Sequence, residues 1–207
     1  MNNPAAGAIM RAESSKPGTR PAIFLDRDGT VIEHVHYLSD PDKVRLIPGV
    51  ADSLRRLRDA GYALVIVTNQ SAIGRGMITV EQLGLVNDEM SRQLAIEGLK
   101  LDGIYYCSEA PVGDDRLETS HVDRKPGPGM LLRASSDLGL DTASSWMIGD
   151  MISDVLAGIN AGCKGNLMVR TGKVLPEAEA SKADGYRVVA DLPAAADVIL
   201  GASAGPA

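Results

Sequence analysis

Short apolar runs alternate along the chain with longer segments whose apolar residues recur at helical spacing. The short runs predict buried strands, and the longer periodic segments predict helices. Strands that alternate with helices indicate a parallel sheet covered on both faces. We therefore expect an α/β fold with a doubly wound, Rossmann-like sheet. The predicted strands are 22–25, 63–68, 104–107, 146–148 and 167–169, and the predicted helices are 50–60, 79–97, 128–138 and 154–161.

Residues with strong end preferences support these helix boundaries. Thr79 and Gln82 have the spacing of a capping box, which predicts the start of the longest helix. Glycines directly follow three of the predicted helices, where glycine commonly ends a helix. An apolar pair at 188–189 and a helix at 193–200 are expected to complete one edge of the sheet. The three terminating glycines are Gly61, Gly139 and Gly162.

The length of 207 residues favours one domain with a sizeable core. We assign 21–207 to that domain. Residues 1–20 are rich in Asn, Pro, Ala, Gly and Ser and lack the apolar centre of a signal peptide, so we expect a disordered tail. The net charge of −6 disfavours a nucleic-acid partner. No apolar run approaches the roughly 18 residues that would span a membrane. Two cysteines provide no disulfide framework, which indicates a reducing, cytoplasmic location.

The segment Asp26-Arg27-Asp28-Gly29-Thr30 follows the first predicted strand and carries the clearest chemical signal. Two residues apart on extended backbone, Asp26 and Asp28 would point the same way, and Gly29 would then allow a sharp turn. Two carboxylates about 4 Å apart repel by roughly 4 kcal/mol at a mid-range dielectric. We expect a divalent metal, or a proton on one acid, to offset this repulsion.

Polar groups also follow other predicted strands. Thr68-Asn69-Gln70 ends the second strand, and Gly149-Asp150 ends the fourth. Ligands of open parallel sheets bind beyond the carboxyl ends of the strands, so these groups should meet in one crevice. Lys125 precedes a helix and is expected to reach the same rim.

This set of residues suits phosphoryl transfer. A carboxylate such as Asp26 can attack phosphorus, while Asp28 can act as general acid and then as general base. The acids Asp26, Asp28 and Asp150, with a backbone carbonyl, form a hard oxygen site suited to Mg²⁺. Lys125 and Thr68 can hold the phosphoryl oxygens as charge develops.

In these motifs, taken with Arg124-Lys125-Pro126 and Asp154, the chain resembles the phosphatase branch of the haloacid dehalogenase superfamily. The resemblance implies Asp26 as nucleophile, Asp28 as acid/base, and Mg²⁺ on Asp26, Asp150 and the backbone carbonyl of Asp28. It also implies phosphate binding by Thr68 and Lys125, with Asp154 orienting Lys125 or outer waters. Dehalogenases of the superfamily need no second acid, so Asp28 favours phosphoryl transfer over carbon–halogen chemistry.

The segments 68–76 and 124–130 are similar to a subgroup, the heptose bisphosphate and histidinol-phosphate phosphatases, which lack a large cap domain. The spacing between motifs here leaves no room for a cap. Loops at 33–48, 70–78 and 108–123 are therefore expected to close the site. Asn69, Arg75 and Arg124 are also predicted to bind substrate. The planar fork of the two arginines suits a second phosphate. His34 and His36 are expected to be solvated loop residues.

A departure from this subgroup concerns its zinc loop. The relatives carry Cys-x-His and Cys-x-Cys, where this chain has Cys107-Ser108-Glu109 and His121-Val122-Asp123. Two interpretations stay open. Either the zinc site is lost and packing holds the loop, or Cys107, Glu109, His121 and Asp123 form a mixed Zn²⁺ site, since all four types can bind zinc. The scarcity of thiolates favours loss.

The sequence thus predicts a cytoplasmic, Mg²⁺-dependent phosphatase acting on a small phosphorylated metabolite, as a monomer or small homo-oligomer. A heptose bisphosphate is the first substrate expected, and histidinol phosphate is the alternative. A phosphotransferase and a non-catalytic, receiver-like phosphate-binding module are the rival classes.

Overall fold

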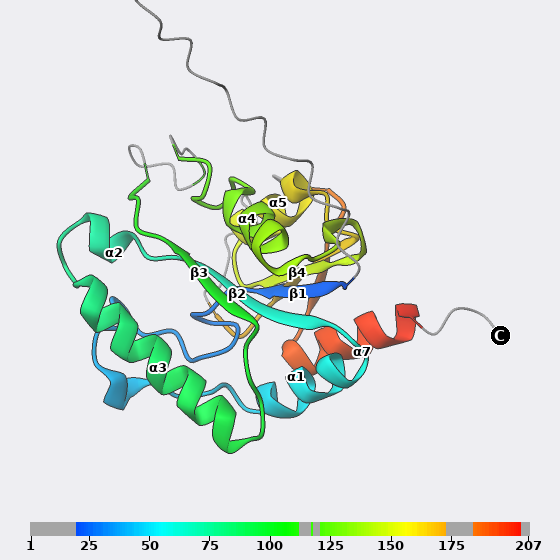
Figure 1. Ribbon diagram of the computed structural model, residues 1–207, viewed down its shortest axis with the longest axis horizontal. Coiled ribbons are helices and arrows are strands. Elements are labelled where there is room, and N and C mark those ends of the chain that lie inside the picture. Colours follow the sequence, from blue (N-terminus) through cyan, green and yellow to red (C-terminus); the bar gives the residue numbers. More distant parts are fainter. Residues whose placement is uncertain (1–19, 112–116, 118–120, 173–183, 204–207) are drawn as a thin grey trace, which may run out of the picture.

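Six parallel strands form the centre of the molecule in a computed structural model, which describes residues 20–111, 117, 121–172 and 184–203 (Figure 1). The strand order is β3-β2-β1-β4-β5-β6, so the chain moves outward from β1 in one direction and then in the other. This order is that of a doubly wound sheet, as predicted. The strands are β1 Ala22–Leu25, β2 Ala63–Asn69, β3 Gly103–Cys107, β4 Trp146–Gly149, β5 Gly165–Val169 and β6 Arg187–Val189.

Alternate residues of each central strand enter two separate hydrophobic clusters. In β1, Ile23 and Leu25 belong to one cluster, while Ala22 and Phe24 belong to the other, and all four are fully buried. Successive side chains of a strand point to opposite faces, so each cluster lies on one face of the sheet. The continuous apolar runs in the sequence reflect burial on both faces.

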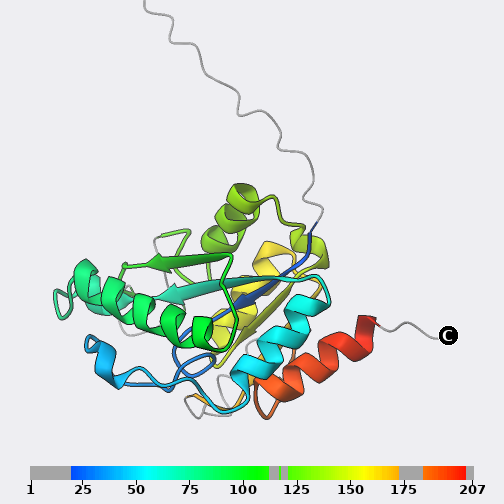
Figure 2. The ribbon, with the colours of Figure 1, turned by 60° about the horizontal axis from the view of Figure 1, so that its bottom comes forward.

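Helices cover both faces of the sheet (Figures 1 and 2). The cluster with Ile23 includes residues of α1 (Val50–Asp59), α3 (Val80–Ile96) and α7 (Leu192–Ser203). The cluster with Phe24 includes residues of α4 (Gly129–Leu138) and α5 (Ile152–Ala161). Among the described residues, these five helices are the ones longer than about one turn, and no separate cap domain is formed.

The predicted helix ends are confirmed in most cases. Thr79 and Gln82 form the capping box at the start of α3, and Gly139 and Gly162 end α4 and α5 with φ of 63° and 78°. The predicted start of α5 at Asp154 was two residues late, because Asp154 lies in the first turn and accepts a hydrogen bond from the Met151 N–H at 2.9 Å.

Three short elements were not predicted: α2 (Ser71–Gly74) and the 3₁₀ helices η1 (Pro41–Lys43) and η2 (Thr142–Ser144). Each is about one turn long, too short for an apolar period to develop. Arg20, the last residue of the predicted tail, is instead held by the domain: its side chain donates to the backbone oxygens of Gly61 and Tyr62 and to Asp102. Residues 1–19 lie outside the described residues. No described helix is both long and apolar enough to cross a membrane.

Candidate active site

A pocket of about 240 Å³ opens at the carboxyl ends of β1, β2 and β4. The three segments expected to close the site all contribute to its wall. His34 to Leu38 come from the first, the start of α2 with Arg75 comes from the second, and Pro111 and Leu117 come from the third. The described residues of the third segment are 108–111, 117 and 121–123. The predicted residues that line the pocket are Asp26, Asp28, Thr68, Asn69, Arg75, Arg124, Lys125, Asp150 and Asp154.

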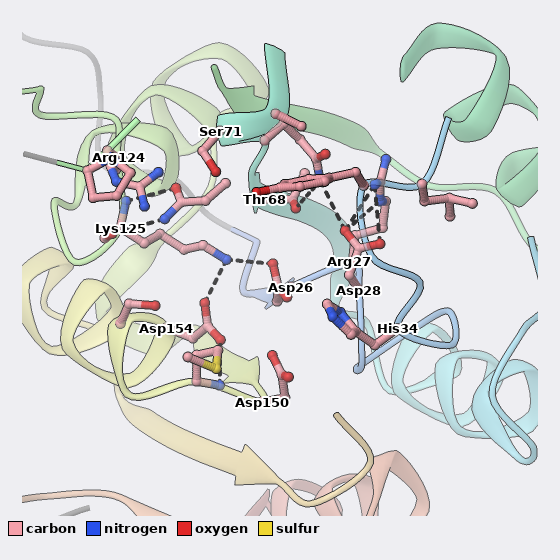
Figure 3. A pocket seen from close by; sticks show the side chains of 18 of the residues that line it. Asp26, Arg27, Asp28, His34, Thr68, Ser71, Arg124, Lys125, Asp150 and Asp154 are labelled. Carbon is pink, nitrogen blue, oxygen red and sulfur yellow. Dashed lines mark hydrogen bonds and ion pairs between the residues drawn. The ribbon is translucent and has the colours of Figure 1, made fainter. Parts of the chain in front are cut away.

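Lys125 lies at the centre of the buried polar contacts, and its side chain is almost fully buried. Its ammonium lies 2.6 Å from Asp26 Oδ1 and 2.6 Å from Asp154 Oδ1 (Figure 3). The same ammonium donates to the backbone oxygen of Val67 in β2 at 2.7 Å. An ammonium has three N–H donors, so these contacts occupy all of them.

The charges of this buried group depend on one another. Burial alone would lower the pKa of Lys125, but the carboxylates of Asp154 and Asp26 outweigh burial and raise it. Burial raises the pKa of Asp154 to about 6, although Lys125 opposes the rise. Lys125 is therefore a fixed positive charge at neutral pH, next to the predicted nucleophile.

Three buried carboxylates gather where a metal was predicted. Oxygen atoms of Asp26, Asp150 and Asp154 lie within 4.8 Å of one another. Asp154 already accepts from Lys125 through Oδ1 and from the Met151 N–H through Oδ2. Asp26 and Asp150 are therefore the better candidates for direct metal ligands, while Asp154 holds Lys125. These hard oxygen donors fit Mg²⁺.

The side chain of Asp28 lies apart from this carboxylate group. Its Oδ2 is 2.9 Å from Arg27 Nη2 and accepts from Gln70 Nε2 at 3.0 Å. The expectation that only a metal or a proton offsets the repulsion between Asp26 and Asp28 was therefore incomplete. Each carboxylate has its own cation, Lys125 for Asp26 and Arg27 for Asp28. The position of Arg27 between two acids is the sequence signal for this pairing.

Thr68 and Asn69 end β2 at the pocket, but their side chains differ in role. Gln70 Nε2 donates to Thr68 Oγ1 at 3.0 Å, so the Thr68 hydroxyl keeps its own proton to donate. Asn69 was predicted to bind substrate. Its amide instead bonds the backbone of Lys125 twice, at 3.0 Å in each direction. The Asn69 side chain therefore positions the loop that carries Lys125.

Away from the carboxylates, the pocket is lined by cationic and aromatic side chains, here called the outer pocket: Arg75, Arg124, His34 and His36. Arg75 is exposed in the short helix region, whereas Arg124 is buried and donates to the backbone oxygen of Glu109 at 2.7 Å. His34 and His36, which were expected to be merely solvated, are exposed but also line the pocket.

Glu109 and Asp123 of the altered zinc loop lie near Cys107, but the loop's described side chains do not bring their ligand atoms together as a metal group. In the part of the chain that the structure describes, the three aspartates form the one candidate metal group. Cys107 is buried at the end of β3. Asp123 pairs with Arg133, and the Asp123 N–H donates to His121 Nδ1 at 3.2 Å. This arrangement gives no support to a mixed Zn²⁺ site.

The segment after β5 packs beside Asp150 of the candidate metal group. Thr171 Oγ1 donates to the backbone oxygen of Gly29 at 2.6 Å. A Cβ placed on Gly172 would lie 1.9 Å from Asp150 Oδ2, so only glycine fits beside that carboxylate. No sequence pattern predicts these two contacts, because they join the segment after β5 to the separate segments that follow β1 and β4.

Comparisons with known proteins agree with this geometry. The HAD-hydrolase-like family model matches residues 122–195. A Yersinia pestis protein named D-glycero-beta-D-manno-heptose-1,7-bisphosphate 7-phosphatase is 47% identical over 178 residues, which cover 84% of this chain and 94% of that protein. The protein of the same name from Escherichia coli K12 is 44% identical over 177 residues, 84% of this chain and 93% of its own.

Solved structures show the same fold. The D,D-heptose 1,7-bisphosphate phosphatase of B. bronchiseptica, complexed with magnesium and phosphate, has a TM-score of 0.75 and 32% identity, over 88% of this chain and 99% of that one. A putative HAD-like phosphatase from Mesorhizobium loti also has a TM-score of 0.75, with 31% identity over 92% of this chain and 89% of that one. The chain therefore belongs to the haloacid dehalogenase-like hydrolases, in the same family as the heptose bisphosphate phosphatases.

Proposed function

We propose that this protein hydrolyses a phosphate monoester through an aspartyl-phosphate intermediate, with Mg²⁺ as cofactor. The observation that carries the proposal is the buried contact of Lys125 with Asp26 and Asp154, next to Asp150 at the carboxyl ends of the central strands. A fixed ammonium next to a carboxylate prepares the site for a phosphate dianion, because it offsets the repulsion between the two anions.

Asp26 and Asp150 would hold the metal, together with the backbone carbonyl of Asp28. When bound, Mg²⁺ supplies positive charge that screens the nucleophile from the incoming phosphate. The protein supplies the buried carboxylates that would surround the metal. Asp154 among them already pairs with Lys125 and accepts a hydrogen bond from the Met151 N–H.

The side chains divide the reaction between them. An oxygen of Asp26 forms a bond to phosphorus, and the bond from phosphorus to the leaving oxygen breaks. Asp28 gives the leaving oxygen a proton, and then takes a proton from the water that hydrolyses the aspartyl phosphate. The Thr68 hydroxyl is placed to hold a phosphoryl oxygen during both steps. Lys125, whose three N–H donors contact Asp26, Asp154 and the Val67 carbonyl, would attract the phosphoryl oxygens through its fixed positive charge.

For the substrate we propose the 7-phosphate of D-glycero-D-manno-heptose 1,7-bisphosphate. The names of the relatives support this choice, since they are 44% to 47% identical over 84% of the chain. Arg75 and Arg124 in the outer pocket fit a substrate with a second phosphate. Histidinol phosphate, which has one phosphate, is the alternative.

The proposal places this enzyme in the cytoplasm, since both cysteines are free thiols. We also propose that the enzyme functions without zinc. Asp123 pairs with Arg133, and His121 accepts a hydrogen bond from the Asp123 backbone N–H, so both predicted ligands have other partners. Metal analysis of the purified protein tests this part. Stoichiometric zinc would contradict it.

A kinetic comparison with Mg²⁺ tests the proposal. Wild-type protein should hydrolyse the heptose bisphosphate with a higher kcat/KM than histidinol phosphate. Asp28→Asn keeps the shape and an acceptor for Arg27 but cannot transfer the proton. We expect it to lower kcat on the sugar phosphate by about 10²- to 10⁴-fold. Undiminished turnover by Asp28→Asn would contradict the acid/base role, and transfer of phosphate to added alcohols in place of water would indicate a phosphotransferase.

A further inference from the structure

Arg27 is a buried cation for which the proposed reaction has no use. Its side chain is 1% exposed, although it lies between the two reactive aspartates in the sequence. Its Nε and Nη2 both approach Asp28 Oδ2, at 3.1 Å and 2.9 Å. Its remaining nitrogen, Nη1, donates to Asn87 Oδ1 in α3 at 2.8 Å. The planar guanidinium therefore joins Asp28 to a helix outside the reaction site (Figure 3 shows the Asp28 side of this contact).

Gln70, which lies between β2 and α2, also approaches Asp28. Its Nε2 donates to Asp28 Oδ2 and to Thr68 Oγ1, at 3.0 Å in each case. Asp28 is thus contacted by a charged fork and by a neutral amide, which are carried by different elements. Thr68 and Asp28 are linked through the same amide nitrogen.

We propose that Arg27, Gln70 and Asn87 act as positioning residues, here called the Asp28 clamp, which fix the Asp28 carboxylate where it can reach the leaving oxygen of the substrate. This inference rests on the proposed function, and it specifies which residues make proton transfer by Asp28 efficient. Asn87 is not among the described residues that line the pocket, and it would act on Asp28 through its hydrogen bond with Arg27.

The physical argument concerns orientation. The Asp28 side chain is 18% exposed and lies in a polar pocket, so without partners its carboxylate could rotate. A misplacement of about 1 Å in a reacting group can cost about 10²-fold in rate. A buried Arg27 that lost Asn87 would have an unpaired N–H in the protein interior, which it could satisfy by moving away from Asp28. The clamp therefore couples α3 to the position of the acid.

The leaving group shows whether this coupling matters. When an alkyl phosphate is cleaved, the electron pair of the broken bond stays on a poor leaving oxygen, which needs the proton from Asp28. When p-nitrophenyl phosphate is cleaved, the leaving oxygen is stable without a proton. A misplaced Asp28 therefore slows the first step for the alkyl ester far more than for the aryl ester.

The test measures kcat and kcat/KM of Asn87→Ala for both esters, with the heptose bisphosphate as the alkyl ester. We expect kcat/KM for the sugar ester to fall by about 10- to 100-fold, and that for p-nitrophenyl phosphate to fall by less than about threefold. Asn87→Asp keeps the acceptor for Arg27 and should restore the wild-type ratio. Asp88→Ala, at the exposed next position of α3, is the matched control and should change neither ester.

Arg27→Lys provides a second test, because it keeps the charge but loses the fork, and it should shift the ratio in the same direction. Thermal melting checks that each variant is folded. An equal loss on both esters, or no loss on either, in folded Asn87→Ala would overturn the clamp. Wild-type protein that hydrolyses neither ester would instead overturn the proposed function.

Discussion

Replacement of Lys125 by Met should destabilise the protein strongly, and the loss should depend on Asp154. The ammonium of Lys125 contacts Asp26, Asp154 and the Val67 carbonyl within 2.7 Å. Its removal leaves two buried carboxylates without their cation. Breaking a buried ion pair in this way costs about 3–5 kcal/mol.

The dependence on Asp154 can be measured by a double-mutant cycle. Asp154 is 1% exposed, so in Lys125→Met its charge has no cation and little water. Asp154→Asn removes that charge and keeps an acceptor for the Met151 N–H. The double variant should therefore be more stable than the sum of the two single losses predicts, by about 1–3 kcal/mol.

Urea unfolding at neutral pH with EDTA is the assay, since bound metal would otherwise stabilise the same carboxylates. Lys100→Met, at an exposed lysine, is the control and should stay within about 0.5 kcal/mol of wild type. A loss below about 1 kcal/mol in Lys125→Met would refute the energetic argument. Strictly additive losses would refute the coupling between Lys125 and Asp154.

Two further outcomes follow from the packing around the site. In Gly172→Ala the added Cβ would lie 1.9 Å from Asp150 Oδ2, so Mg²⁺ affinity measured by calorimetry should fall by about 10- to 100-fold. Gly84→Ala, where a Cβ would meet nothing within 4 Å, should leave the affinity unchanged, and equal affinities in the two variants would contradict this reasoning. Burial raises the pKa of Cys107, and it raises that of Cys163 to about 12. At about pH 8 iodoacetamide should alkylate the native thiols far more slowly than the unfolded ones, with rates that keep rising at higher pH, because only the thiolate reacts. Rapid labelling of the native protein would show that the thiols are exposed.

The sequence by itself determined the architecture and indicated most of the residues that line the candidate site. Apolar runs separated by helical periods indicated a sheet buried on both faces, because that burial needs little alternation within each strand. Asp26, Thr68 and Asp150 could be assigned to one site, because parallel strands bring their carboxyl ends to the same edge. Gly139 and the capping box at Thr79 marked helix ends through local backbone preferences, which need no tertiary contact.

Only the tertiary structure decided how these groups are paired. Three sets of contacts join residues far apart in sequence: the ion pair of Lys125 with Asp154, the two hydrogen bonds between the Asn69 side chain and the Lys125 backbone, and the hydrogen bond from Arg27 to Asn87. Local periodicity cannot predict such contacts, because it reports which face of an element is buried and not which side chain lies opposite. Asp26 and Asp28 are two residues apart in one motif but contact different cations, since the turn after β1 directs one carboxylate toward Lys125 and the other toward Arg27.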